Sequence, residues 1–158
     1  MSDTRHTPTA DDDARVVPVD LRDYVRFSEA APCRVRVFAT EDLALDLWCL
    51  EPQQSTGVLH YPAQDVTYTV IGGRSWFVTD DGEVGLDPLG AMLVRADTVH
   101  GIDNRAPDPL IVAASSAPPS VEPVDAPVSS AAAAIRSDAD AGMFTRLANA
   151  IAQRRTPR

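Results

Sequence analysis

The sequence predicts a single all-β domain, an antiparallel sandwich or small barrel, followed by a C-terminal helical tail. Between residues 34 and 114, apolar and polar residues alternate in short runs, as they do in strands that bury one face. Turn residues separate these runs at roughly 8 to 12 residue intervals. No helical periodicity lies between the runs. Such a pattern is typical of antiparallel all-β folds.

Length and charge limit the function classes. The 158 residues suffice for one domain whose hydrophobic core needs no metal or disulfide. All 14 basic residues are arginine, against 23 acidic residues, and the net charge is -9. Phosphate backbones and anionic lipid repel such a chain, so we expect neither nucleic acid nor a membrane as partner. The first residues lack the apolar core of a signal peptide, and we expect a cytoplasmic protein.

The first 50 residues contain an approach segment and two strands. Residues 1–14 include three successive aspartates and are predicted to be a disordered leader, with the barrel spanning 15–116. A short edge strand is predicted at Val16–Val19 within a loop-rich segment. Val35 and Val37 then share one face of a strand. In the following strand, which ends before Pro52, the apolar residues on one face are Leu43, Leu45, Leu47 and Cys49. Cys33 and Cys49 fit neither a zinc motif nor a disulfide framework and are expected to be apolar thiols.

The remaining strands are expected at 57–61, 66–71, 75–78, 83–86, 90–95 and 110–114. Gly72-Gly73, Asp80-Asp81-Gly82 and Asp87-Pro88 mark turns between them. Residues 117–136 are rich in Pro and Ala and are predicted to be a linker. Residues 137–158 are predicted to form an amphipathic helix with a basic end. Its apolar stripe consists of Met143, Phe144, Leu147, Ala150 and Ile151.

The predicted helix over residues 138–155 has two interpretations. It could fold back onto the barrel or a partner subunit, or it could dock a protein partner as a short peptide behind a flexible linker. Truncation at Pro118 separates them. A loss of thermal stability favours the packed helix, whereas unchanged stability with lost co-purification favours docking.

Two histidines in the centre of the chain belong to recognisable motifs. His60 precedes the turn Val70-Ile-Gly-Gly73-Arg74, and a second motif runs from Gly90 through His100 to Asn104. With these motifs, residues 57–104 resemble the cupins, and the resemblance extends over about residues 33–116. It implies a double-stranded β-helix, a jelly-roll-like barrel, and a homodimer.

The metal centre implied by this resemblance, three His and one Glu, is matched in part. His60 and His100 carry over, whereas Pro62 stands at the second His position and Val66 at the Glu position. Two imidazoles bind a divalent metal poorly, because tight sites have three or more protein ligands. With Asp65 as a third ligand, the histidines would form a two-His, one-carboxylate site for Fe, Mn, Ni or Zn. No organic cofactor is expected.

Strand parity decides which residues of the 65–71 strand line the barrel. If Val66 faces inward, Tyr68 and Val70 do so too, and this apolar set packs better than one with Asp65 inside. A bulge at the strand start could still turn Asp65 inward. Tyr68 is then either core or an acid or substrate anchor with its hydroxyl in the cavity. Arg95 is expected to form a surface pair with Asp97 or Asp103, or else to clamp a carboxylate at the barrel mouth.

Two functions follow from these predictions. The first is a small cytoplasmic cupin that acts on a small organic molecule in the barrel, as a metal-assisted oxygenase, isomerase or lyase, with His60, His100 and Tyr68 at the centre. A barrel histidine without metal could also act as a general base or hold an acidic ligand. The second is a non-catalytic cupin, a ligand-binding or accessory protein, with a decayed metal site and a partner-docking helix. The sequence names neither the substrate nor the reaction.

Overall fold

A computed structural model of the chain describes residues 15–119, 123 and 135. The leader predicted at 1–14 and the helix predicted at 137–158 lie outside the described residues. The part described contains no helix long and apolar enough to cross a membrane. Its elements are η1 (Leu21–Tyr24), β1 (Cys33–Ala39), β2 (Ala44–Leu50), β3 (Asp65–Gly72), β4 (Ser75–Thr79), β5 (Gly82–Leu86), β6 (Ala91–Val94), β7 (His100–Asp103) and β8 (Leu110–Ala117).

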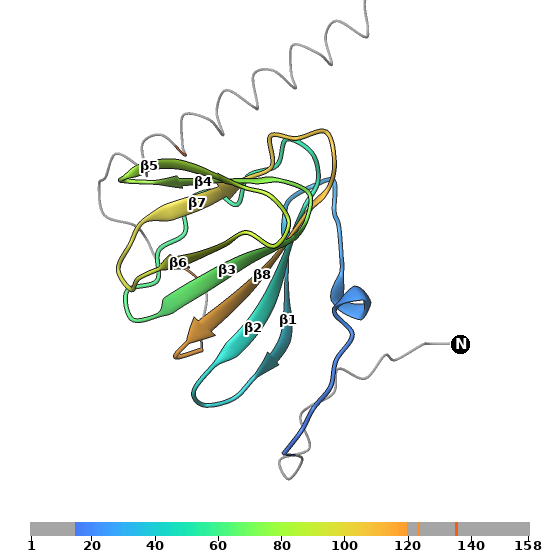
Figure 1. The fold of residues 1–158 in the computed structure, drawn as a ribbon, viewed down its shortest axis with the longest axis vertical. Helices are drawn as coiled ribbons and strands as arrows, with labels where there is room; N and C mark the ends of the chain where they lie inside the picture. The colour runs from blue at the N-terminus through green and yellow to red at the C-terminus, as the bar shows by residue number, and fades with distance from the viewer. Residues whose placement is uncertain (1–14, 120–122, 124–134, 136–158) are drawn as a thin grey trace, which may run out of the picture.

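The strands form two sheets, a larger and a smaller one (Figure 1). The five-stranded sheet has the order β1-β2-β8-β3-β6, and the three-stranded sheet has the order β5-β4-β7. All the pairings between these strands are antiparallel. The last strand, β8, lies between β2 and β3 and pairs with both along their length. The predicted all-β architecture is therefore confirmed.

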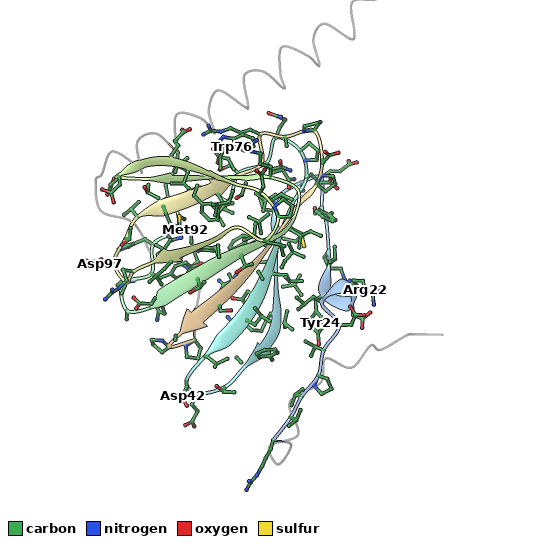
Figure 2. The ribbon with its side chains drawn as sticks, in the orientation of Figure 1. Arg22, Tyr24, Asp42, Trp76, Met92 and Asp97 are labelled. Carbon is green, nitrogen blue, oxygen red and sulfur yellow. The ribbon has the colours of Figure 1, made fainter. Side chains whose placement is uncertain are left out.

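The main hydrophobic core is built from alternate residues of the strands. On β3, Val66, Tyr68 and Val70 are at most 2% exposed, while Thr67 is exposed. This is the parity that the sequence analysis favoured. From the three-stranded sheet, Phe77 and other apolar residues join the same core. Figure 2 shows Met92 of β6, which packs against this core from the edge of the larger sheet.

A second apolar cluster covers the outer face of β1, β2 and β8. Val37, Leu47 and Ala113 are buried there. The residues packed over them from the N-terminal segment are Val19, Leu21, Tyr24 and Val25. Tyr24 is labelled in Figure 2 beside this face. The apolar face predicted from the alternation of β2 is this outer face, and β2 is buried on both sides. No strand forms at residues 16–19, so the predicted edge strand is wrong.

The strand predicted at 57–61 is not regular either. Two isolated bridges join residues 55–59 to β7, one between Ser55 and Asp103 and one between Leu59 and His100. Leu59 and His100 exchange two backbone hydrogen bonds, of 2.7 and 3.1 Å. The loop therefore runs along the edge of β7 and brings His60 next to it.

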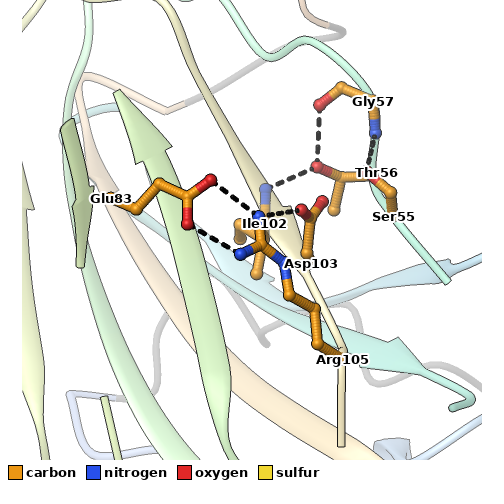
Figure 3. A network of polar contacts seen from close by, with 7 residues as sticks. All are labelled: Ser55, Thr56, Gly57, Glu83, Ile102, Asp103 and Arg105. Carbon is orange, nitrogen blue, oxygen red and sulfur yellow. Dashed lines mark hydrogen bonds and ion pairs between the residues drawn. The ribbon is translucent and has the colours of Figure 1, made fainter. Parts of the chain in front are cut away.

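Polar contacts fasten this loop to β7, and β7 to β5 (Figure 3). The Thr56 hydroxyl accepts a hydrogen bond from the Ile102 backbone N–H at 3.0 Å. The Arg105 guanidinium donates to both oxygens of Glu83, at 2.7 and 2.9 Å, and to Asp103 at 3.1 Å. One arginine thus ties two strands that do not pair with each other.

One described residue of the predicted linker is buried against the domain. Ile135 is 1% exposed and packs with Val78, Val99 and Val58 on the three-stranded sheet, on the face opposite the main core. Gly101 leaves room for it, because a Cβ there would lie 2.8 Å from Ile135 Cδ1. The chain beyond β8 therefore returns to the domain at residue 135.

Candidate functional site

Tyr68 and His100 form a buried hydrogen-bonded pair that joins β3 of the larger sheet to β7 of the smaller one. Tyr68 Oη lies 2.7 Å from His100 Nε2, and the two residues are 0% and 1% exposed. His100 Nδ1 lies 3.0 Å from the Thr98 carbonyl oxygen, which can only accept. Nδ1 therefore carries the proton, and Nε2 accepts from the Tyr68 hydroxyl.

Burial keeps this pair uncharged near neutral pH. Desolvation lowers the pKa of His100 to about 4; the Thr98 carbonyl opposes this, and the nearby His60 adds to it. Desolvation also raises the pKa of Tyr68 well above its usual value, with a smaller contribution from Tyr61. The barrel therefore contains a neutral donor and a neutral acceptor.

His60 lies near His100 but directs its ring elsewhere. Its Nε2 is 2.8 Å from Oδ1 of Asp97, in the turn between β6 and β7. The His60 side chain is 7% exposed and that of Asp97 is 74% exposed. Asp97 lies at the edge of the barrel in Figure 2. The pair therefore runs from the interior to the surface, and it leaves His60 Nε2 engaged with a carboxylate.

Asp65 does not join the histidines. Its Oδ1 accepts a hydrogen bond from the Ala96 backbone N–H at 2.7 Å, and its Oδ2 lies 3.6 Å from Arg95 Nε. Val66 takes the inward position beside it, so the carboxylate faces the turn after β6. The structure therefore does not place Asp65 with His60 and His100, as the predicted two-His, one-carboxylate site requires.

Arg95 forms a surface pair, as predicted, but with a different partner. Its side chain is 77% exposed and lies next to Asp65 rather than Asp97 or Asp103. Those two aspartates bond to other side chains. Arg95 therefore helps to hold the turn after β6 against the start of β3.

The donor set does not fit the metal centre that the resemblance implies. Among the described residues, no group of three or more His, Cys, Asp or Glu side chains is placed to hold a metal ion. Pro62 is exposed and Val66 is buried in the core, at the positions of the second His and the Glu. His60 and His100 are left, fewer ligands than tight sites use.

A charged cluster that the sequence analysis missed lies on β1 and β2. Asp46 is 2% exposed and accepts hydrogen bonds from Arg34 Nε and Nη2 at 3.0 and 2.7 Å, and from Arg36. Arg36 is the cross-strand neighbour of Asp46, and Arg34 that of Trp48. Alternation along β1 and β2 could have revealed the cluster, because these charged residues alternate with the apolar residues of the outer face and therefore share the opposite face.

Arg34 links this cluster to the buried pair. Its guanidinium carbon lies 5.9 Å from the ring centres of both Trp48 and Tyr61, within cation–π range. The Tyr61 ring lies 6.3 Å from the ring of His100. Although burial dominates the pKa of Tyr68, the charge of Arg34 acts on it and lowers it. Trp48, Tyr61 and Tyr68 all belong to the main core, so the guanidinium faces the barrel interior.

These residues form an inner polar row that leads from solvent to the core. Its members are Arg36, Asp46, Arg34, Trp48, Tyr61, His100 and Tyr68. The side chain of Arg36 is 41% exposed, that of Arg34 is 14% exposed, and Tyr68 is fully buried. The arrangement offers a cationic group, two aromatic faces and a neutral hydrogen-bonding pair to one region of the barrel.

Comparisons with known proteins identify the fold. No family model and no curated protein matches the sequence. A structure from Thermus thermophilus has 25% sequence identity and a TM-score of 0.62, over 65% of this chain and 98% of that one. A Klebsiella pneumoniae protein with a double-stranded beta-helix domain has 28% identity and a TM-score of 0.61, over 66% and 90%. An RmlC-like cupin from Desulfovibrio desulfuricans has 20% identity and a TM-score of 0.60, over 66% and 99%.

Each of these three chains is covered nearly in full, and the match accounts for about two thirds of the present chain. That share corresponds in length to the η1–β8 region. The two-sheet topology, the histidine motifs and these matches agree. The chain therefore has the double-stranded β-helix fold, which is also the fold of the cupins among these structures.

Proposed function

We propose that this chain is a cupin that binds a small organic acid in its barrel, with Arg34 holding the carboxylate and the Tyr68–His100 pair bonding a polar group further in. The observation that carries the proposal is the Arg34–Asp46 pair, which is largely buried and lies against aromatic rings of the main core, with Arg36 at its more exposed end. A charged cluster in an all-β core needs a reason, because burial of ionic groups costs more than apolar packing.

Arg34 has the properties of a carboxylate-binding residue. A guanidinium presents a planar fork of donors, and Asp46 fixes the orientation of that fork through Nε and Nη2. The ring centres of Trp48 and Tyr61 each lie 5.9 Å from the guanidinium carbon, and the Arg34 side chain is only 14% exposed, so its attraction for an anion is screened less than at the surface. Arg36 places a second positive charge at the more exposed end of the row.

The properties of the buried Tyr68–His100 pair fit ligand binding better than proton transfer. A histidine whose pKa is about 4 is a weak base at pH 7, and both ring nitrogens of His100 already have partners. Tyr68 can exchange its bond to His100 for one to a ligand oxygen. We therefore infer that the non-catalytic, ligand-binding function is the primary one. The proposed binding mode uses no metal, because the described residues bring together no set of three His, Cys, Asp or Glu ligands.

Ligand-observed NMR on the full, chelator-treated chain tests this proposal. Benzoate, succinate and pyruvate are compared with benzamide, succinamide and pyruvamide, which have similar shapes without the charge. The acids should bind at least about tenfold more tightly, because a charge-assisted hydrogen bond contributes roughly 1.5 to 3 kcal/mol. The Arg34→Gln/Asp46→Asn double variant should lose this preference without leaving a lone buried carboxylate.

The matched control is Arg22→Gln/Asp20→Asn. This pair is also an arginine–aspartate contact, at 2.6 Å, but it lies on the surface, with Arg22 88% exposed. The control should keep the preference for acids. Equal binding of acids and amides to the unmodified chain would refute the proposal, and so would a preference that survives in the Arg34→Gln/Asp46→Asn variant.

A further inference from the structure

The two cysteines of the chain are direct cross-strand neighbours. Cys33 is the first residue of β1, and its register partner on β2 is Cys49. Opposed residues of an antiparallel pair project to the same side of the sheet. Both are free thiols in the structure. The strand register therefore pairs the two cysteines of the sequence with each other.

The register brings these two residues within reach of a covalent bond. Opposed Cα atoms in antiparallel strands lie about 4.5 to 5.5 Å apart. Disulfides span Cα separations of roughly 4.4 to 6.8 Å. Formation of the bond therefore requires side-chain rotation rather than a new strand register. The two thiols are also close enough for the charge of Cys33 to act on the pKa of Cys49.

The two thiols differ in access. Cys49 is fully buried, and burial raises its pKa, while Cys33 is partly exposed. A dissolved oxidant therefore reaches Cys33 first, and Cys49 is placed to react with the product formed on Cys33. Arg26 partly opposes the effect of burial on the pKa of Cys49, through a backbone hydrogen bond and, to a smaller extent, through its charge.

We propose that Cys33 and Cys49 are a modification site at which a small-molecule disulfide, such as oxidised glutathione, introduces a reversible cross-strand disulfide. The Cys33 thiolate attacks one sulfur of the oxidant and releases the first glutathione thiol. The Cys49 thiolate then attacks the Cys33 sulfur of the mixed disulfide and releases the second. The two protein thiols lose two electrons and two protons, and two molecules of reduced glutathione are formed. The reaction does not require the proposed barrel ligand.

The bond would fasten the end of the larger sheet. β1 ends the strand order, and β2 is the only described strand with which it pairs. The next register pair along the ladder is Arg34 with Trp48, both members of the inner polar row. Oxidation would therefore hold the strand that carries Arg34 and Arg36 more firmly.

The test uses the full chain, reduced, desalted and incubated with oxidised glutathione. Thiol titration of the denatured product should fall from two thiols to none, with an intact mass lower by two hydrogens and no added glutathione. Non-reduced tryptic digests should contain residues 27–34 linked to residues 37–74. The disulfide should raise the melting temperature. Dithiothreitol should restore both thiols and reverse that rise.

Single variants provide the controls. Cys33→Ser and Cys49→Ala each keep one thiol, so neither can lose two hydrogens. Cys33→Ser should also react with oxidised glutathione much more slowly than Cys49→Ala, because its remaining thiol, that of Cys49, is buried. The proposal is overturned if the folded chain keeps both thiols, if it carries two separate glutathione adducts, or if the bond forms between two chains.

Discussion

The neutral state of His100 predicts how stability depends on pH. Its pKa is lowered from 6.5 to about 4, chiefly by burial, and the residue is 1% exposed. Between these two values the unfolded chain binds a proton that the folded chain does not, so stability falls as pH falls. The loss is about 1.4 kcal/mol per pH unit and about 3 kcal/mol over the whole window. Above the unfolded pKa, this contribution is complete and constant.

Urea unfolding from about pH 4 to pH 8 measures this effect, with the fluorescence of buried Trp48 as one reporter. The comparison variant is His100→Gln, which keeps an acceptor for Tyr68 and cannot gain a proton in this range. Carboxylates elsewhere titrate in both proteins, so the difference between the two curves isolates His100. Wild-type and variant curves that run parallel from pH 7 to pH 4 would refute the account of the buried pair.

Three further predictions concern stability and use the same unfolding assay. Ile135→Ala, or truncation at Pro118, should lower the unfolding free energy by about 2 kcal/mol, since a fully buried side chain is lost; unchanged stability would contradict this packing. Tyr68→Phe should cost about 1 to 3 kcal/mol because His100 Nε2 loses its donor, and a neutral result would mean that a water replaces it. Gly73→Ala should cost about 2 to 4 kcal/mol, because φ is +80° and its Cβ would meet the Pro109 carbonyl oxygen at 2.3 Å. Ala at Gly82, where φ is also positive but space is open, should cost less.

The strand content and the inward face of β3 could be predicted because both depend on local alternation. Val66, Tyr68 and Val70 recur with period two, and only that parity fills the barrel with apolar side chains. The cover over the outer face could not be predicted in the same way. Leu21 and Tyr24 belong to a segment with no clear period, and their burial becomes visible only when β1 and β2 are in place.

Contacts between strands could not be predicted from the sequence, because they depend on the register in which the strands pair. Arg36 meets Asp46 because of the turn length after β1, and a register shift between Arg36 and Phe38 changes the pairing along the same hairpin. Tyr68 and His100 were both predicted as site residues, but their hydrogen bond joins two different sheets. No spacing along the chain encodes that distance. The predicted homodimer and the predicted protein partner of residues 138–155 stay predictions.

The arginine cluster lies on the face of β1 and β2 opposite the apolar face that the sequence predicts. The predicted apolar phase is the outer face, under the N-terminal segment. The opposite phase carries Arg34, Arg36 and Asp46, which an alternating strand normally turns to solvent. Here the same phase of β2 carries Trp48 and Leu50 into the main core between the two sheets. The charged phase, rather than the apolar one, therefore contains the candidate ligand site.

A benzoate titration of the chelator-treated chain, followed by the ¹H–¹⁵N NMR signals of arginine and tryptophan side chains, tests the central claim most directly. The signals of Arg34 Nε–H and Trp48 Nε1–H should shift together and saturate with one Kd. Arg22 and Trp76, the other tryptophan of the chain, should stay unchanged, and benzamide should have little effect. Shifts confined to Arg22 or Trp76, or equal shifts with benzamide, would contradict a carboxylate site in the barrel.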